Sequence, residues 1–230
     1  MSEHVEKLLA DWTQRIAESE PGRVLDVGCG RGRVLELLRE RKIEALGLEA
    51  GEARLRELAE RGLDFREGSA LELPFEDKSF DTVALRHVLH HLSDHELALK
   101  EAARVARKQL WIAEPCYETR IDSQAAGDRL DRWHKRQHET TETSVHRNNL
   151  LVHELLASIH EAVGEEPDIE LGRYLPLTRW SVDEVERRFG PFAAKLPSED
   201  PERELYAELL EMVRSGAMTR GGSLWIQVKL

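Results

Sequence analysis

Three glycines stand at alternate positions directly after a short apolar run, at Gly28, Gly30 and Gly32, and Asp26 precedes them. A residue without a Cβ atom accepts a positive φ angle and lets a ligand approach the backbone closely. A carboxylate two residues before the first glycine suits a ligand that offers cationic donors better than one that offers phosphate oxygens. These residue types predict a binding site for a small charged ligand at a turn.

The elements on either side of the glycines would position such a site. Residues 23–27 are typical of a buried parallel strand, and Val34, Leu35, Leu37 and Leu38 begin the apolar face of a helix. The dinucleotide-binding fingerprint has the spacing G-x-G-x-x-G, whereas this turn has G-x-G-x-G. The strand, the acidic residue and the turn together resemble motif I of the class I S-adenosylmethionine-dependent methyltransferases.

A second stretch, residues 69–81, carries a more specific resemblance. Its sequence, SALELPFEDKSFD, resembles a segment of the ubiquinone/menaquinone-biosynthesis-like (methyltransferase type 11) branch of that superfamily. The family usually has Asp where this chain has Ser69, so the resemblance implies that a hydroxyl accepts the hydrogen bond of the adenine amino group, without the added charge. It also implies that backbone groups of Ala70 and Leu71 share the adenine edge. The resemblance covers residues 23–115 and implies S-adenosylmethionine as the cofactor.

An acidic residue farther along is expected at the ribose of that cofactor. Glu49 ends a predicted strand over residues 43–49, about 20 residues past the glycine turn, where such folds place a ribose-binding carboxylate. One carboxylate can accept hydrogen bonds from both ribose hydroxyls. The expected cofactor-binding residues are Asp26, Gly28, Cys29, Gly30, Gly32, Glu49, Ala50, Ser69, Ala70, Leu71 and Arg86.

The catalytic candidates lie at or after the ends of two predicted strands, residues 82–85 and 108–115. Methyl transfer from a sulfonium donor is an in-line displacement, so the protein mainly aligns the acceptor, excludes water and removes a proton. Imidazole titrates near neutrality, which makes His87, His90 and His91 candidate general bases, and Glu114 is a comparable candidate. The alternative is that these residues only pack or cap a helix.

Two other kinds of chemistry have weaker support. His134 and His138 have the spacing of two zinc ligands on one helical face, but no third ligand stands in an obvious motif, and no metal is predicted. Cys116 could suggest the nucleophile of pyrimidine carbon-5 methylation, which needs a covalent cysteine adduct. Its neighbours do not resemble those enzymes, so a structural thiol is expected.

The composition predicts a cytoplasmic globular protein. The 230 residues can bury one substantial core, and no apolar run approaches the ~20 residues of a membrane span. The N-terminus lacks a signal-peptide core, and the two cysteines do not suggest a disulfide framework. The net charge of −11 argues against broad contact with nucleic acid. A possible local basic patch, more typical of a solvated helix face, consists of Arg129, Arg132, Lys135 and Arg136.

The predicted fold is α/β, with a doubly wound, mostly parallel seven-stranded sheet and an inserted helical cap. The core is expected over about residues 20–116 and 180–230 of a single methyltransferase domain, and the cap over about 117–179. Residues 192–196 suggest the sixth strand, and residues 222–230 the last. Two or three helices over residues 121–163 would cover the acceptor pocket.

The predicted function is methyl transfer from S-adenosylmethionine to a small-molecule acceptor, with no membrane association and with a homodimer as a possible assembly. One alternative is an RNA or protein methyltransferase that uses the basic patch for docking. Another is a non-catalytic partner that binds the cofactor and supports an active methyltransferase.

Overall fold

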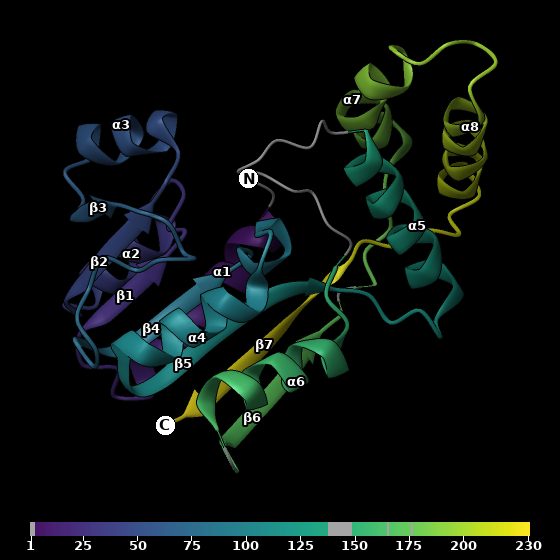
Figure 1. Cartoon of the computed structure of the whole chain (residues 1–230). Coiled ribbons are helices and arrows are strands. Elements are labelled where there is room, and N and C mark those ends of the chain that lie inside the picture. Colours follow the sequence, from purple (N-terminus) through teal and green to yellow (C-terminus); the bar gives the residue numbers. More distant parts are fainter. Residues whose placement is uncertain (1–2, 138–148, 165, 176) are drawn as a thin grey trace. The chain divides into compact units, whose positions relative to one another are not determined.

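The computed structural model describes residues 3–137, 149–164, 166–175 and 177–230 (Figure 1). Seven strands form one sheet in the order β3-β2-β1-β4-β5-β7-β6, and the pairs from β3 through β5 are parallel. This confirms the predicted α/β class and the doubly wound, mostly parallel sheet. The strands are β1 (Val24–Val27), β2 (Ala45–Glu49), β3 (Phe65–Glu67), β4 (Phe80–Arg86), β5 (Ala106–Cys116), β6 (Asp168–Tyr174) and β7 (Gly222–Lys229).

Some of the helices begin at a side-chain cap. Oδ1 of Asp94 accepts the N–H of Leu97 at 2.9 Å, and Oδ1 of Asp200 accepts the N–H of Glu202 at 2.8 Å. The helices are α1 (Glu3–Glu18), α2 (Arg33–Glu40), α3 (Glu52–Glu60), α4 (His95–Val105), α5 (Asp122–Arg136), α6 (Val152–Val163), α7 (Val182–Ala193) and α8 (Pro201–Arg214), with a 3₁₀ turn, η1 (Leu89–His91).

The chain divides into two compact units. The first comprises residues 1–114, 150–172 and 225–230, and the second comprises residues 115–149 and 173–224. Helix α6 and most of β6 therefore belong to the first unit, whereas α7 and α8 belong with α5 in the second. The predicted division into a core and a cap stays a prediction.

In the first unit, α1 and α2 cover one face of the sheet. Trp12 of α1 and Leu38 of α2 belong to the same buried cluster as Val24 of β1 and Trp111 of β5. Because side chains alternate along a strand, Asp26 projects from the same face as Val24. The carboxyl group of motif I is therefore directed toward the helices rather than toward the opposite face of the sheet.

The second unit is built on contacts among its helices. Leu130 of α5, Phe189 of α7 and Leu209 of α8 belong to one buried cluster. The strand predicted over residues 192–196 is wrong, because α7 continues to Ala193. Val185, Phe189 and Ala193 are buried at a spacing of four residues, which is the pattern of one helical face.

The order in which the chain adds strands to the sheet reverses between β1 and β4. The chain adds β2 and β3 on one side of β1, and then adds β4 and β5 on the other side. In open α/β sheets, ligands bind beyond the carboxyl ends of the strands at this reversal. The ends of β1 and β4 carry the glycine turn and Arg86, respectively.

Candidate functional site: a cavity at the glycine turn

The glycine turn has backbone angles that other residues rarely adopt. The φ angles are 66° at Gly28 and 56° at Gly30. A Cβ atom on Gly28 would lie 2.6 Å from Cγ2 of Val88, whereas a Cβ atom on Gly30 would meet no atom within 4 Å. Gly28 therefore lets the turn pack closely against Val88, while Gly30 leaves space open for a ligand.

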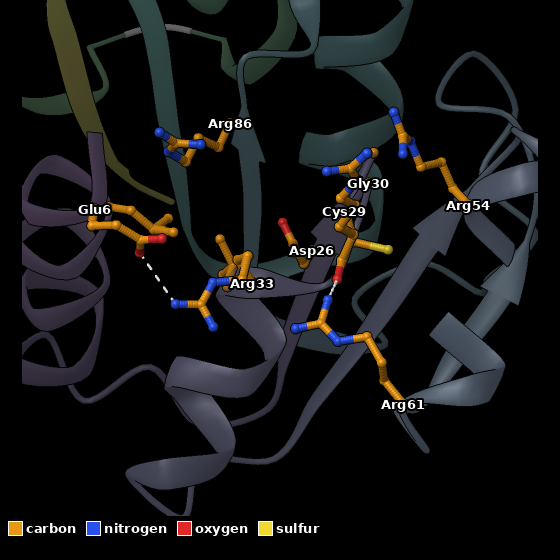
Figure 2. A pocket seen from close by; sticks show the side chains of 12 residues that line it. Glu6, Asp26, Cys29, Gly30, Arg33, Arg54, Arg61 and Arg86 are labelled. Atoms are coloured by element: carbon orange, nitrogen blue, oxygen red, sulfur yellow. Dashed lines mark hydrogen bonds and ion pairs between the residues drawn. The ribbon is translucent and has the colours of Figure 1, made fainter. Parts of the chain in front are cut away.

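That open space is part of a cavity of about 400 Å³ in the first unit. Figure 2 shows Asp26 in the middle of its lining, with Arg86 and Glu6 on one side and Cys29 and Gly30 on the other. Glu6 and Leu9 come from α1, so the first helix borders the cavity. The remaining lining residues are Gly28, Arg31, Arg33, Val34, Arg54 and Arg61.

Asp26 is buried, with 2% of its surface exposed. Its Oδ2 atom is buried and has no hydrogen-bond partner among the described residues. Burial raises the pKa of Asp26 to about 7, Arg86 opposes this rise, and Glu49 adds to it. A buried acceptor without a donor is costly, so this oxygen is suited to a donor that a ligand would bring.

Cys29 also lines the cavity, but its thiol packs away from the ligand space. A Cβ atom on Gly47 of β2 would lie 2.6 Å from Sγ of Cys29, which shows how closely the thiol approaches that strand. Burial raises the pKa of Cys29 far above its usual range. The backbone of Cys29 is also engaged, because its N–H donates to the carbonyl of Leu48 at 3.0 Å.

The carboxylate of Glu49 is held by three backbone N–H groups. Oε2 accepts the N–H of Gly30 at 2.8 Å, and Oε1 accepts those of Ala50 and Gly51 at 3.0 and 2.9 Å. Glu49 therefore connects the end of β2 to the glycine turn. Its side chain has a fixed orientation without any ligand, and Ala50 contributes through its backbone.

Ser69, Ala70 and Leu71 lie after β3 and are not among the residues that line the cavity. Ser69 is exposed, and its Oγ accepts the N–H of Leu71 at 3.1 Å. Ser69 also forms an antiparallel bridge with Glu72. The hydroxyl thus shapes its own turn, and it keeps further hydrogen-bonding capacity for a ligand.

Glu114 organises the segment that follows β4. This buried carboxylate accepts the N–H groups of Val88 and Leu89 through Oε1, at 3.0 and 2.9 Å. Its Oε2 lies 2.5 Å from Nδ1 of His90. All of these contacts are with the protein, so the geometry favours a positioning role for Glu114 over the predicted catalytic one.

His87 and His91 flank that segment and are both partly exposed. His87 has a φ angle of 55°, and its N–H donates to the carbonyl of Ala113 at 2.7 Å. The ring of His91 lies 3.9 Å from that of His90, centroid to centroid. Neither His87 nor His91 lines the 400 Å³ cavity, and their catalytic role stays a prediction.

Sequence reasoning predicted Arg86 but missed the other arginines that line the cavity. Arg33 is the first residue of α2, Arg54 lies in the first turn of α3, and Arg61 follows α3, positions that commonly hold solvent-exposed arginines. Only the folded chain shows that the turn gathers them around one space. A pattern that could have found them is the recurrence of arginine at helix ends beside the glycine turn.

The predicted basic patch in the second unit is neutralised by acidic partners. Each of its four members forms an ion pair, at distances from 2.6 to 3.3 Å. The pairs are Arg129 with Glu208, Arg132 with Asp128, Lys135 with Asp131 and Arg136 with Glu202. The case for a nucleic-acid-binding surface at these residues is therefore weaker than the sequence alone suggested.

The other candidate chemistries can be placed as far as the structure describes them. His134 packs edge-on against Phe189 and Phe192, and His138 lies outside the described residues. The described residues contain no group of three or more potential metal ligands. Cys116 is buried, which raises its pKa to about 11.

Among the helices of the described chain, none is both long and apolar enough to cross a membrane.

A family model described as a methyltransferase domain matches residues 25–112. YcgJ of Bacillus subtilis, named as an uncharacterized methyltransferase, is 34% identical over 93 residues, which are 37% of this chain and 37% of YcgJ. The demethylmenaquinone methyltransferase of Thermotoga maritima is 33% identical over 107 residues, 43% of this chain and 46% of that protein. The ajmaline N-methyltransferase of Rauvolfia serpentina is 34% identical over 98 residues, 39% of this chain and 34% of that protein.

The chain matches less than half the length of each of these relatives. The crystal structure of YcgJ is similar over 95% of this chain and 97% of YcgJ, with a TM-score of 0.65 and 19% identity. That likeness concerns the fold. The family match supports the predicted enzyme class, and S-adenosylmethionine is the cofactor that this family implies. Residues 25–112 therefore belong to the methyltransferase domain family, and the chain has the fold of the class I S-adenosylmethionine-dependent methyltransferases.

Proposed function

We propose that this chain transfers a methyl group from S-adenosylmethionine to a small-molecule acceptor. The observation that carries the proposal is the buried, unpartnered Oδ2 of Asp26 at a cavity beside Gly30, within the family-matched segment. The methionine end of the cofactor bears an ammonium group, which is a donor for this oxygen. The residues present therefore fit the group that the family implies.

Glu49 is proposed to bind the ribose, with one adjustment to the sequence-based expectation. A carboxylate offers about four acceptor positions, and three backbone N–H groups already use three of them. The remaining position can accept one ribose hydroxyl without any change in the turn. Binding both hydroxyls at once would require Glu49 to give up a backbone contact.

The chemistry would be divided between the cofactor and the protein. The bound cofactor supplies a methyl group on a positively charged sulfur, which needs little activation. The protein would align the acceptor and remove its proton, for which His87 and His91 remain the proposed bases. Glu114 would hold the Val88–His91 segment in place through its backbone contacts.

The small-molecule acceptor is supported by two observations. The names of two relatives specify demethylmenaquinone and ajmaline, which are small molecules. The basic patch that motivated RNA or protein docking is neutralised within its own unit.

The family match ends at residue 112, and the second unit begins at residue 115. We therefore assign acceptor preference to the second unit.

Calorimetric titration with S-adenosylmethionine and with NAD tests the donor. The expected result is binding of the former and none of the latter. Transfer of a labelled methyl group to a panel of phenols, quinols and amines then tests the reaction. Absence of S-adenosylmethionine binding would overturn the proposal, and binding without turnover on any acceptor would favour the non-catalytic partner. The cytoplasmic location and the homodimer stay predictions.

A further inference from the structure

The sheet ends in two edge strands of different character. Strand β3 has three residues, two of which are the charged Arg66 and Glu67. Strand β6 has seven residues, includes neither proline nor lysine, and lies beyond β7 at the other edge (Figure 1). Proteins commonly shorten an edge strand or place lysine or proline on it, because its unpaired backbone groups recruit other strands. Of the two edges, β6 is the one that lacks these devices.

The charged side chains of β6 are largely engaged within the chain itself. Nζ of Lys229 donates to Oδ2 of Asp168 at 2.9 Å, and Nη1 of Arg173 donates to Oε2 of Glu118 at 3.2 Å. Among the residues that the structure describes, Glu170 forms no ion pair. The charge that this edge presents to a neighbouring strand is therefore mainly one carboxylate.

The two faces of β6 differ in what covers them. On one face, Gly172 packs against β7, because a Cβ atom on this glycine would lie 2.5 Å from the ring of Trp225. On the other face lie Ile169 and Leu171, since alternate residues of a strand share a face. Leu171 is the midpoint of the strand and is 43% exposed. Five of the seven residues are exposed, so the described part of the chain leaves this edge uncovered.

We propose that β6 pairs antiparallel with β6 of a second copy of this chain, about a two-fold axis at Leu171. The two sheets would join at this edge, and the unpaired N–H and C=O groups of each strand would bond to those of the other. This inference gives the predicted homodimer a surface, and it does not depend on the reaction that the chain performs.

The sequence of β6 favours this axis because it complements itself there. A two-fold axis perpendicular to the sheet places one residue opposite its own copy. An axis at Glu170 would bring two carboxylates together, and an axis at Gly172 would bring no side chains together. An axis at Leu171 pairs all seven residues of the strand and places two leucines in contact.

The remaining pairs of this register are also compatible. Glu170 lies opposite Gly172 of the second copy, where no side chain opposes its charge. Ile169 is the diagonal neighbour of Leu171 of the second copy, within reach across two strands. Ile169 and Leu171 of both copies would therefore form one apolar patch. A strand from another protein would not reproduce this symmetry, which is why the proposal names a second copy.

A pair of opposite charge variants tests the axis. Leu171→Lys and Leu171→Glu are purified separately, and sedimentation velocity measures their mass alone and after mixing, over a dilution series. We expect the unmodified chain to form dimers. Each variant alone should show a dimer dissociation constant raised at least ~10-fold, because the leucine contact is lost and like charges meet at the axis. An equimolar mixture should recover a dimer, because opposite charges then meet there.

Leu97→Lys is the matched control, because Leu97 lies on α4 and is also exposed, at 40%. It should dimerise as the unmodified chain does. A monomeric unmodified chain would overturn the proposal, as would Leu171 variants that dimerise normally or monomeric variants that fail to associate when mixed. Hydrogen exchange of the unmodified chain gives a test without variants. The amides of residues 168–174 should exchange more slowly in the dimer than after dilution, and equal rates would overturn the proposal. Absence of methyl transfer leaves these measurements unaffected.

Discussion

Nδ1 of His90 lies 2.5 Å from Oε2 of Glu114, and the other oxygen of that carboxylate holds the backbone of the same turn. Because a carboxylate only accepts hydrogen bonds, Nδ1 carries the proton in this contact. In the neutral ring, the second nitrogen of His90 is then an acceptor. The pair therefore fixes both the turn after β4 and the tautomer of its central histidine.

Glu114→Gln should destabilise the protein. An amide group cannot accept at both ends, so at least one of the three donors facing Glu114 would lose its partner in a buried site. We expect a loss of about 3 kcal/mol in the free energy of unfolding, measured by urea denaturation. Glu76→Gln, at an exposed position, is the control. Unchanged stability with a large loss of turnover would instead support the catalytic role predicted from the sequence.

Asp26 should make stability depend on pH in the absence of cofactor. Its pKa is raised from about 4 in an unfolded chain to about 7 in the folded one, so the folded state binds more protons between these values. This group therefore stabilises the fold below about pH 4, and the contribution is lost as the pH rises through 7, by at most about 4 kcal/mol.

Asp26→Asn removes the titrating group from the same position. Urea unfolding of both proteins at pH 5 and pH 8 should show that the variant gains stability relative to the unmodified chain at the higher pH. Asp11→Asn, at an exposed position of α1, controls for charge alone. A stability difference between Asp26→Asn and the unmodified chain that is the same at both pH values would contradict the assigned shift.

Gly28→Ala and Gly30→Ala should separate folding from binding. Both positions have a positive φ, so each alanine costs about 1 kcal/mol from the backbone. At Gly28 the new methyl group would also meet Val88, which adds a loss of stability. At Gly30 it would enter the cavity, so cofactor affinity should fall more than stability. Thermal unfolding and calorimetry measure the two effects, and equal behaviour of the two variants would contradict this distinction.

Glu49→Gln should loosen the glycine turn. The amide nitrogen of glutamine would face a backbone N–H, which is a donor opposite a donor. We expect faster hydrogen exchange at Gly30 and weaker cofactor binding. Glu52→Gln, on the exposed side of α3, should leave both unchanged. Retention of slow exchange at Gly30 would show that the carboxylate is not what holds the turn.

His87→Asn and His91→Ala test the proposed bases once an acceptor is known. Asparagine tolerates the positive φ of His87, so the backbone at the end of β4 should be retained. The expected result is unchanged affinity for S-adenosylmethionine with a lower kcat. Turnover equal to that of the unmodified chain would show that the residue only packs against its neighbours and is not the base.

The parallel strands were predictable because buried strands of this kind are short apolar runs. Residues 24–27 and 80–86 are almost continuously buried, and their sequences show it. Strand β6 was missed for the converse reason. Residues 168–174 are exposed at most positions on the sheet edge, so their sequence, DIELGRY, is not a continuous apolar run like those of the buried strands.

Some residues of the site were likewise predictable from the sequence, and others were not. Asp26 and Glu49 follow from spacing within one βαβ unit, which local sequence specifies. The position of Glu114 beside the turn at residues 88–90 depends on the register that pairs Arg86 with Ala113 in the next strand. Registers between strands are set by the whole sheet, and the pairing of the surface arginines is set by helix placement, so neither was visible in the sequence.

The three backbone contacts of Glu49 have a consequence for the thermodynamics of binding. Ordering a free glutamate side chain costs about 1.5–2 kcal/mol in conformational entropy. Here folding has already restricted the rotamers of Glu49, so a ligand that meets this carboxylate does not bear that cost. The carboxylate of Glu49 is thus preorganised before any ligand meets it.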